Sequence, residues 1–546
     1  MKAWFKKGEH WIWMSSAAVA VSVVLVFGLI AMISYKGLIH FWPHEVYEYQ
    51  LKQGDKTEML VGELRDTKMK EVQNAQSQQP ELVPQYLIKM GNRDLYGIDF
   101  RWINETDLVS ADQKLANDIV VIERYEYGNV YGWLEAFAVD GKRYSGSEEI
   151  DPVLAEQVEK GSELHSEIKH IEKIEIGSVN YQLEQLRLDE KRLRANNAFD
   201  AEAKSELDQE RAELQKKFEQ HQAAAQVLYK QLDSLGELTV KVSGGQSMQV
   251  PVRKIVEFWQ PNNMSFGEKA GFFFHGIGRF LSEDPREANT EGGIFPAMIG
   301  TITMVLLMTV LVTPMGVIAA IYMREYAKDG PLLRTVRISI NNLAGVPSIV
   351  FGIFGLGFFV YIIGGSIDEL FYGYALPSPT FGTPGLLWAA LTMALLTLPV
   401  VIVSTEEGLA RIPRSLREGG LALGATKIET ISRIVLPMAT PAIMTGLILA
   451  IARAAGEVAP LMLVGVVKLA PELPVDSIAP FVHLDRKFMH LGFHIYDVGF
   501  QSPNVEASQP LVYATSLLLI IIIVGLNLGA ISIRNRLREK YKALDS

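Results

Sequence analysis

Two charged residues, Arg453 and Glu457, interrupt a strongly apolar stretch from Pro441 to Val464. A spacing of four residues places both side chains on one face of a helix. An arginine at the depth of a membrane is costly and usually faces a bundle interior or a water-filled pathway. Its planar fork of donors suits an oxyanion, phosphate above all. We therefore predict that Arg453 and Glu457 line a substrate pathway, with a purely structural ion pair as the alternative.

A second apolar stretch, 345–364, opens with residues that interrupt helices. Gly345, Pro347 and Gly352 lie close together here, and Ser348 lies among them. Broken helices at membrane depth are tolerated where they line a cavity, and the N-terminus of a half-helix attracts anions. Ser348 is accordingly predicted to donate its hydroxyl to the substrate pathway. The alternative is that these glycines only allow helices to pack closely.

The elements that carry these residues are apolar segments long enough to span a bilayer, which takes about 20 residues of helix. Six segments qualify or come close: Trp11–Ser34, Ile294–Met323, Gly345–Gly364, Leu386–Ser404, Pro441–Val464 and Leu511–Ile533. Lys and Arg are concentrated before the first segment, after the last and in alternate loops, which predicts that both termini are cytoplasmic. The first segment is too long for a cleavable signal peptide and is interpreted as a retained anchor.

This topology divides the chain into four parts. Residues 1–35 form the cytoplasmic N-terminus with the first span, and 36–293 form a large insertion outside the membrane. Residues 294–534 form a core of five spans with a cytoplasmic loop at 405–437, and 535–546 form a cytoplasmic tail. The predicted fold class is an α-helical membrane protein with six transmembrane helices and a large α+β periplasmic insertion.

The insertion changes character along its length. Alternating apolar and polar residues with turn signals at Gly91-Asn92, Gly128-Asn129 and Asp140-Gly141 predict β-hairpins between residues 81 and 147. Two charged helical runs follow at 151–235, with apolar residues at three- and four-residue spacing and a break at Asn196-Asn197. We interpret them as an antiparallel coiled-coil hairpin, with Asp200 as the N-cap of its second arm. The hairpin is either a solvated spacer or a docking site for a periplasmic partner.

The cytoplasmic loop carries a recognisable pattern: Glu418-Gly419-Gly420, then Gly424-Ala425, and later Leu436-Pro437. It resembles the EAA loop of ABC importer permeases, which forms a short helix docked on a cytoplasmic ATPase. The resemblance implies that Glu418, Gly419, Gly420, Gly424 and Ala425 couple the chain to an ATPase. Two glycines in that helix cost roughly 1–2 kcal/mol relative to alanine, so its first turn is expected to be looser.

Two further stretches, Asn342–Gly352 and Ile451–Leu461, narrow the resemblance to one family. The first reads NLAGVPSIVFG and the second IARAAGEVAPL. Both are similar to signatures of PstA, a permease subunit of phosphate-specific ABC importers, over about residues 290–540. The resemblance implies a permease for inorganic phosphate in the bacterial inner membrane. It also implies a PstC-like permease partner, a PstB-like ATPase dimer and a periplasmic phosphate-binding protein.

Other functions fit the composition less well. The chain has no Walker A sequence G-x-x-x-x-G-K-[ST], so ATP hydrolysis is assigned to a separate subunit and no catalytic residue is expected. The net charge of −10 argues against nucleic-acid binding, and the absence of Cys excludes disulfides. His483, His490 and His494 lack a metal-ligand spacing, and no metal or cofactor is predicted. Arg411, Arg414 and Arg417 are interpreted as positive-inside residues or as partners of acidic groups on the ATPase. The alternatives are a permease for sulfate or molybdate, the PstC-type sister subunit and, more remotely, a membrane sensor.

Overall fold

The computed structural model describes residues 9–53, 56–73, 80–109, 114–502 and 505–542. The chain divides into two compact units. The membrane unit comprises Met1–His40, Ile294–Ser502 and Gln509–Ser546, and the inserted unit comprises Phe41–Gly293 with Pro503–Ser508.

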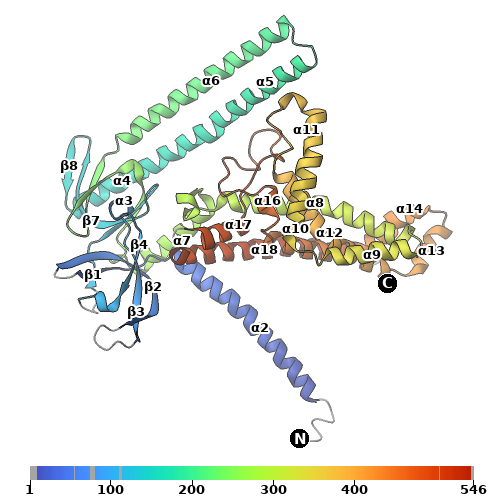
Figure 1. Ribbon diagram of the computed structural model, residues 1–546, viewed down its shortest axis with the longest axis horizontal. Helices are drawn as coiled ribbons and strands as arrows, with labels where there is room; N and C mark the ends of the chain where they lie inside the picture. The colour runs from blue at the N-terminus through green and yellow to red at the C-terminus, as the bar shows by residue number, and fades with distance from the viewer. Residues whose placement is uncertain (1–8, 54–55, 74–79, 110–113, 503–504, 543–546) are drawn as a thin grey trace. The chain divides into compact units, whose positions relative to one another are not determined.

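The membrane unit contains six helices that are long and apolar enough to cross a bilayer, which confirms the predicted number within the described residues. Their limits are His10–Phe41, Phe295–Tyr326, Ser348–Phe371, Leu386–Arg411, Lys427–Gly456 and Ser508–Glu539. The elements that form them are α2 (Glu9–Leu38), α8 (Phe295–Ile321), α10 (Ser348–Phe354), η7 (Gly355–Gly364), α11 (Gly365–Phe371), α12 (Leu386–Arg411), α14 (Lys427–Thr430), η9 (Ile431–Val435), α15 (Leu436–Gly456) and α18 (Val505–Lys542) (Figure 1). Shorter helices connect them: α9 (Pro331–Leu343), α13 (Arg414–Ala422), α16 (Leu461–Val464) and α17 (Leu491–Tyr496).

Helix α12 is the centre of this bundle. It packs against both α8 and α15, and 67% of its most apolar stretch is buried inside the protein. Two glycines let α12 and α15 approach closely. A Cβ atom on Gly408 would lie 2.5 Å from the Cβ of Ala442, and one on Gly446 would lie 2.7 Å from the Cβ of Ser404. Close backbone approach at small residues is the usual way in which membrane helices associate.

Two antiparallel sheets form the base of the inserted unit. The first has the order β4-β3-β2-β1-β5 and the second the order β10-β9-β7-β6-β11, with β8 paired to β7. Their strands are β1 (Val46–Gln53), β2 (Lys56–Gln73), β3 (Pro80–Lys89), β4 (Phe100–Asn104), β5 (Lys114–Leu115), β6 (Val120–Arg124), β7 (Val130–Val139), β8 (Lys142–Ser145), β9 (Glu237–Val242), β10 (Ser247–Pro251) and β11 (Ile255–Trp259). A short pair, β12 (Pro285–Arg286) and β13 (Glu291–Gly292), follows.

The predicted turns are confirmed in two of three places. Gly128-Asn129 connects β6 to β7 and Asp140-Gly141 connects β7 to β8, and each pair has a residue with positive φ. Gly91-Asn92 is different, because it leads into the short helix α3 (Arg93–Tyr96) rather than directly into the next strand. Asn92 is buried there and bonds the backbone of Tyr131, which anchors α3 to β7.

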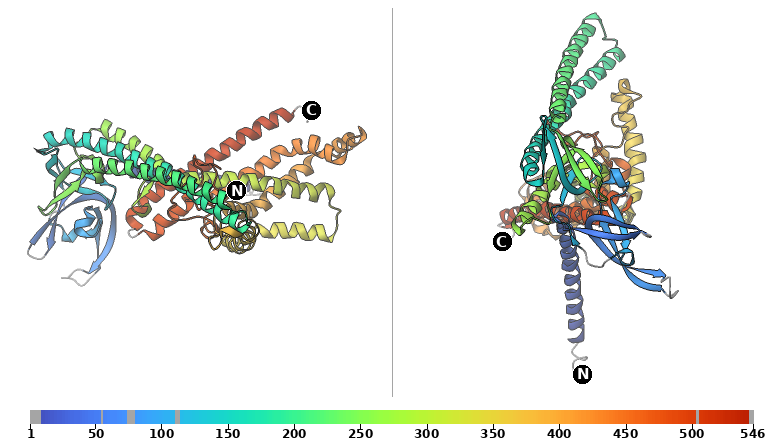
Figure 2. Two further views of the ribbon diagram at one scale, coloured as in Figure 1. Left: turned by 90° about the horizontal axis from the view of Figure 1, so that it is seen from above. Right: turned by 90° about the vertical axis from the view of Figure 1, so that its left-hand side faces the viewer.

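Helices emerge from the second sheet and form two arms. The first arm is α4 (Ser147–His170), η3 (Ile171–Ile176) and α5 (Gly177–Ala195), and the second is α6 (Ala201–Asp233). The predicted break and cap are confirmed, because Asp200 accepts a hydrogen bond from the backbone N–H of Ala203 at 2.8 Å. The two arms run side by side (Figures 1 and 2) and share an apolar cluster built on Val179, Leu186, Leu207 and Leu214.

Candidate functional site

Arg453 lies at the end of a helix rather than partway along one. Helix α15 ends at Gly456, and Glu457 already has extended backbone angles, with φ −86° and ψ 132°. The prediction that both residues share one continuous helical face is therefore wrong for Glu457. The two side chains still form an ion pair, because the Nε of Arg453 lies 3.6 Å from Oε1 of Glu457. Their side chains are 31% and 24% exposed respectively, so neither is fully buried.

The sequence explains why the helix ends here. Gly456 favours the end of the helix because glycine readily adopts non-helical backbone angles. Pro460 has no backbone N–H with which to donate a helical hydrogen bond. The predicted span 441–464 is thus divided into α15 and the short helix α16, and its apolar part extends back to Lys427. In the last turn of α15, the cationic Arg453 lies next to the carbonyl groups that the helix leaves without partners. This position favours a positive charge.

The third span packs against the segment that follows Glu457. A Cβ atom on Gly352 of α10 would lie 2.7 Å from the Cα of Pro460, so Gly352 is required for this approach. Gly345 and Pro347 precede the helix, and Ser348 is its first residue, one turn before Gly352. Within the described ranges, no hydrogen bond or ion pair joins Ser348 to Arg453 or Glu457. The packing role of Gly352 is established, whereas the role of Ser348 in a pathway stays a prediction.

The predicted coupling loop, residues 405–437, contains two short helices, α13 and α14. Helix α13 carries Glu418, Gly419 and Gly420, and the chain turns at Gly424, whose φ is 86°. Ala425 follows, and Thr426 then caps α14 by a capping box with Glu429. A left-handed residue after a helix is normally glycine because it carries no Cβ penalty. Three apolar side chains around this turn are exposed to solvent: Leu421 at 49%, Leu423 at 90% and Ile428 at 67%.

The two adjacent glycines of α13 have different surroundings. A Cβ atom on Gly419 would meet no atom within 4 Å. One on Gly420 would lie 3.0 Å from both Cγ2 and Oγ1 of Thr430 and 3.2 Å from Cδ1 of Ile434. Gly420 therefore lets α13 lie against the start of the fifth span. The glycine that appeared to weaken this helix has a packing function.

Arg417 has a role that the sequence did not reveal. Its Nη2 donates to Oε1 of Glu325 at 2.9 Å and to the carbonyl of Leu409 at 2.8 Å, and its Nη1 donates to the carbonyl of Ile412 at 2.7 Å. The guanidinium thus joins helix α13, the end of α12 and the end of the second span. Most of the donors of Arg417 are thus bonded within the chain, and its pairing with acidic groups on an ATPase stays a prediction. A single sequence offers no signal for a contact between residues so far apart.

The histidines between the fifth and sixth spans have separate partners, and the described residues contain no cluster suited to a metal ion. His483 Nε2 lies 2.9 Å from Oδ1 of Asp476, which also binds Arg486. His490 is buried, and its Nδ1 accepts a hydrogen bond from the N–H of Gly492 at 3.1 Å. Because burial disfavours the charged ring, the pKa of His490 is lowered to about 4.

Comparison with known proteins places this arrangement in a family. Residues 312–542 match the family described as binding-protein-dependent transport system inner membrane component. A phosphate transport system permease protein PstA from Mycobacterium leprae is 35% identical over 245 residues, which cover 44% of this chain and 71% of that protein. A PstA from Yersinia pestis is 38% identical over 183 residues, covering 34% of this chain and 56% of that protein. The solved structure of the MetNI methionine ABC transporter in inward-facing conformations is 19% identical, with a TM-score of 0.32, and covers 45% of this chain and 94% of that one. This chain belongs to the family of PstA-type phosphate transport system permease proteins.

Proposed function

We propose that this chain is a permease subunit of an ATP-driven importer that carries inorganic phosphate across the bacterial inner membrane by alternating access. Membership of the PstA family supports the substrate, and six apolar helices support a multi-pass membrane protein. ATP hydrolysis is assigned to a separate PstB-like ATPase dimer. A PstC-like permease and a periplasmic phosphate-binding protein complete the proposed assembly.

The position of Arg453 carries the proposal for the mechanism. Its guanidinium lies where a membrane helix ends, and its ion pair with Glu457 is 3.6 Å long, beyond a good hydrogen bond. Donors that are held this loosely are available to an oxyanion, to which a guanidinium binds through two parallel hydrogen bonds. Glu457 holds Arg453 when no anion is present. It also repels a bound phosphate, which keeps affinity low enough for the ion to move on. Ser348 is proposed as a further donor along the pathway.

The coupling surface is proposed to be the turn between α13 and α14. Leu421, Leu423 and Ile428 form an exposed apolar patch there, and such a patch on a loop marks an interaction site. Glu418, Gly419, Gly420, Gly424 and Ala425 shape the helix and the turn that present it. Loop 405–437 is therefore assigned to the cytoplasmic side, where it contacts the ATPase.

If loop 405–437 is cytoplasmic, the sidedness of the other segments follows from the number of spans. With six spans, residues 1–35 and 535–546 begin and end in the cytoplasm, 294–534 form the permease core, and 36–293 are periplasmic. We further propose that the arms at 151–235 form an antiparallel coiled coil. The apolar contacts of Val179 and Leu186 with Leu207 and Leu214 support this. The coiled coil is either a spacer or a docking site for the binding protein.

The substrate is tested by competition in proteoliposomes that contain the complete complex. ATP-dependent uptake of radiolabelled phosphate is measured with an excess of unlabelled phosphate, sulfate or molybdate. The proposal predicts that unlabelled phosphate alone suppresses the signal. Uptake that sulfate or molybdate suppresses equally, or transport of those anions in place of phosphate, would contradict the substrate assignment.

A further inference from the structure

Helix α7 (Phe266–Ser282) is amphipathic and lies just before the second span. At 100° per residue, Glu268, His275 and Arg279 share one side, whereas Lys269 lies at the border of the apolar side and pairs with Glu45. The opposite side is entirely apolar and carries Phe266, Phe273, Phe274, Ala270, Ile277 and Leu281. Phe266 is 78% exposed and Phe274 is 70% exposed. Large aromatic side chains are rarely left so open to water on a monomeric soluble surface.

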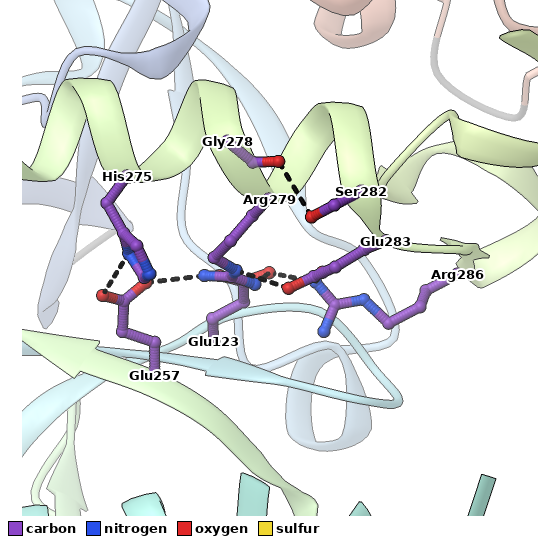
Figure 3. A network of polar contacts seen from close by, with 8 residues as sticks. All are labelled: Glu123, Glu257, His275, Gly278, Arg279, Ser282, Glu283 and Arg286. Atoms are coloured by element: carbon purple, nitrogen blue, oxygen red, sulfur yellow. Dashed lines mark hydrogen bonds and ion pairs between the residues drawn. The ribbon is translucent and has the colours of Figure 1, made fainter. Parts of the chain in front are cut away.

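Ion pairs with strands of the inserted unit's second sheet hold the polar side of α7 (Figure 3). Arg279 contacts Glu257 at 2.6 Å, Glu123 at 3.1 Å and Glu283 at 2.8 Å, and Arg286 also binds Glu123. Burial would raise the pKa of Glu123, but the charges of Arg279 and Arg286 hold that pKa below its usual range. On the same helix, the Phe272 ring packs 4.8 Å from Trp259 of β11. The orientation of α7 is thus fixed, and its apolar side is turned away from the sheet that these contacts define.

One edge of the apolar side packs against Phe41 and Trp42, the first two residues of the inserted unit. The rings of Phe280 and Phe273 lie 5.2 Å and 6.5 Å from that of Phe41, and Phe266 and Phe273 lie 5.7 Å and 6.1 Å from Trp42. Phe41 is the last residue of the span His10–Phe41. It is five residues beyond Lys36, or about 8 Å along a helix, which is roughly the thickness of one headgroup layer.

The other end of α7 is also tied to the membrane. Only residues 283–294 separate Ser282 from Phe295, the first residue of the next span. The aromatic contact at Phe41 therefore places α7 at the level where a bilayer meets water, and the chain returns to the bilayer directly afterwards. Aromatic residues are enriched at this level because their rings suit the boundary.

We propose that α7 is an interfacial helix whose apolar side, from Phe266 to Phe274, inserts into the outer headgroup layer of the bilayer. The occupant of this surface is lipid. Its contact with Phe41 and Trp42 makes it continuous with the end of a membrane span, and amphipathic helices at such a boundary bury their apolar face about 5–10 Å deep. Lys269 borders the apolar side, but its side chain is only 15% exposed and lies 3.8 Å from Glu45, so we expect binding not to depend on anionic lipids.

This chain has no native cysteine, so an introduced cysteine is its single labelling site. Complex that contains the unmutated chain, labelled in the same way, gives the background from the partner subunits. Phe274→Cys and Phe266→Cys are each labelled with an environment-sensitive fluorophore in the complete complex in liposomes, and Val227→Cys, 55% exposed on α6, is the control. Lipids with a nitroxide near the headgroup report contact with the bilayer, and iodide reports contact with water. Phosphatidylcholine liposomes with and without phosphatidylglycerol are compared.

The proposal predicts that nitroxide lipids quench the labels at 274 and 266 well beyond the control, equally in both liposomes. The same labels should be shielded from iodide relative to the label at 227. Quenching by iodide without quenching by lipid would overturn the proposal, because the face would be solvated. Protection from both quenchers would also overturn it, since another protein would then cover the face. Quenching that requires phosphatidylglycerol would contradict the uncharged contact.

Discussion

Replacing Gly420 with alanine tests whether the coupling helix must lie directly against the fifth span. Alanine favours a helix interior over glycine by about 0.8–1 kcal/mol, whichever of the two adjacent glycines is changed. At Gly419 the new methyl group meets no atom within 4 Å, so this gain is realised in full. At Gly420 the methyl group would lie 3.0 Å from two atoms of Thr430, which is only 3% exposed and has little room to move.

Overpacking by one methyl group in a buried contact costs about 1–3 kcal/mol. We therefore expect Gly420→Ala to destabilise the membrane unit by about 0–2 kcal/mol, and Gly419→Ala to stabilise it by up to about 1 kcal/mol. Rotation of Thr430 does not relieve the clash, because Cγ2 and Oγ1 are equally close to Gly420. Thr430→Ala removes both atoms, so the double variant Gly420→Ala/Thr430→Ala should recover stability beyond the sum of the single changes.

The assay is thermal unfolding of the complex in nanodiscs, where 1 kcal/mol shifts the midpoint by about 2–4 °C for a domain of 150–250 residues. ATPase activity is measured in parallel, because a displaced α13 should weaken the coupling of hydrolysis to transport. Equal shifts for the two single variants would refute the steric argument. So would additive effects of Gly420→Ala and Thr430→Ala.

Two further predictions concern polar groups. Arg417→Ala should destabilise the membrane unit by about 1–3 kcal/mol, since Glu325 and the carbonyls of Leu409 and Ile412 lose their donor; thermal unfolding that matches wild type would contradict this role. For His490, the folded-state pKa of about 4 lies below the unfolded value of 6.5, so its stabilising contribution is complete above pH 6.5 and is lost as pH falls toward 4. Unfolding at pH 5.5 should be easier by about 1.4 kcal/mol from this group, and His490→Asn, which keeps an acceptor for Gly492, should reduce that pH dependence. An unchanged pH profile in His490→Asn would contradict the burial argument.

Periodicity and charge predicted the larger elements of the fold. The six spans follow from apolar length. The helical arms with their break at Asn196-Asn197 follow from three- and four-residue spacing, and Asp200 follows from capping chemistry. The hairpin turn at Asp140-Gly141 was also predictable, because both residues have positive φ and Asp-Gly tolerates that conformation. At Gly91-Asn92 the same local signal leads into a helix, since the buried side chain of Asn92 bonds a distant strand.

Most of the missed features depend on contacts between different helices. Arg417 meets Glu325 across 92 positions, and Gly420 meets Thr430 from another helix. The end of α15 at Gly456 was missed because the residues on both sides of it are apolar. The sequence therefore predicted one span, 441–464, where the structure has two helices. Helix α7 was not predicted. Its polar and aromatic residues recur with a helical period, and this pattern would have predicted an amphipathic helix.

The proposed transport mechanism requires Arg453 as a ligand of the transported anion. The direct test is ATP-dependent phosphate uptake by Arg453→Ala in the reconstituted complex, with Arg334→Ala, exposed on α9, as the control. A charge-assisted hydrogen bond contributes about 1.5–3 kcal/mol, so uptake should fall by about tenfold or more while complex assembly stays normal. The control should transport as wild type does. Wild-type uptake by Arg453→Ala would show that the pair with Glu457 only stabilises the end of α15.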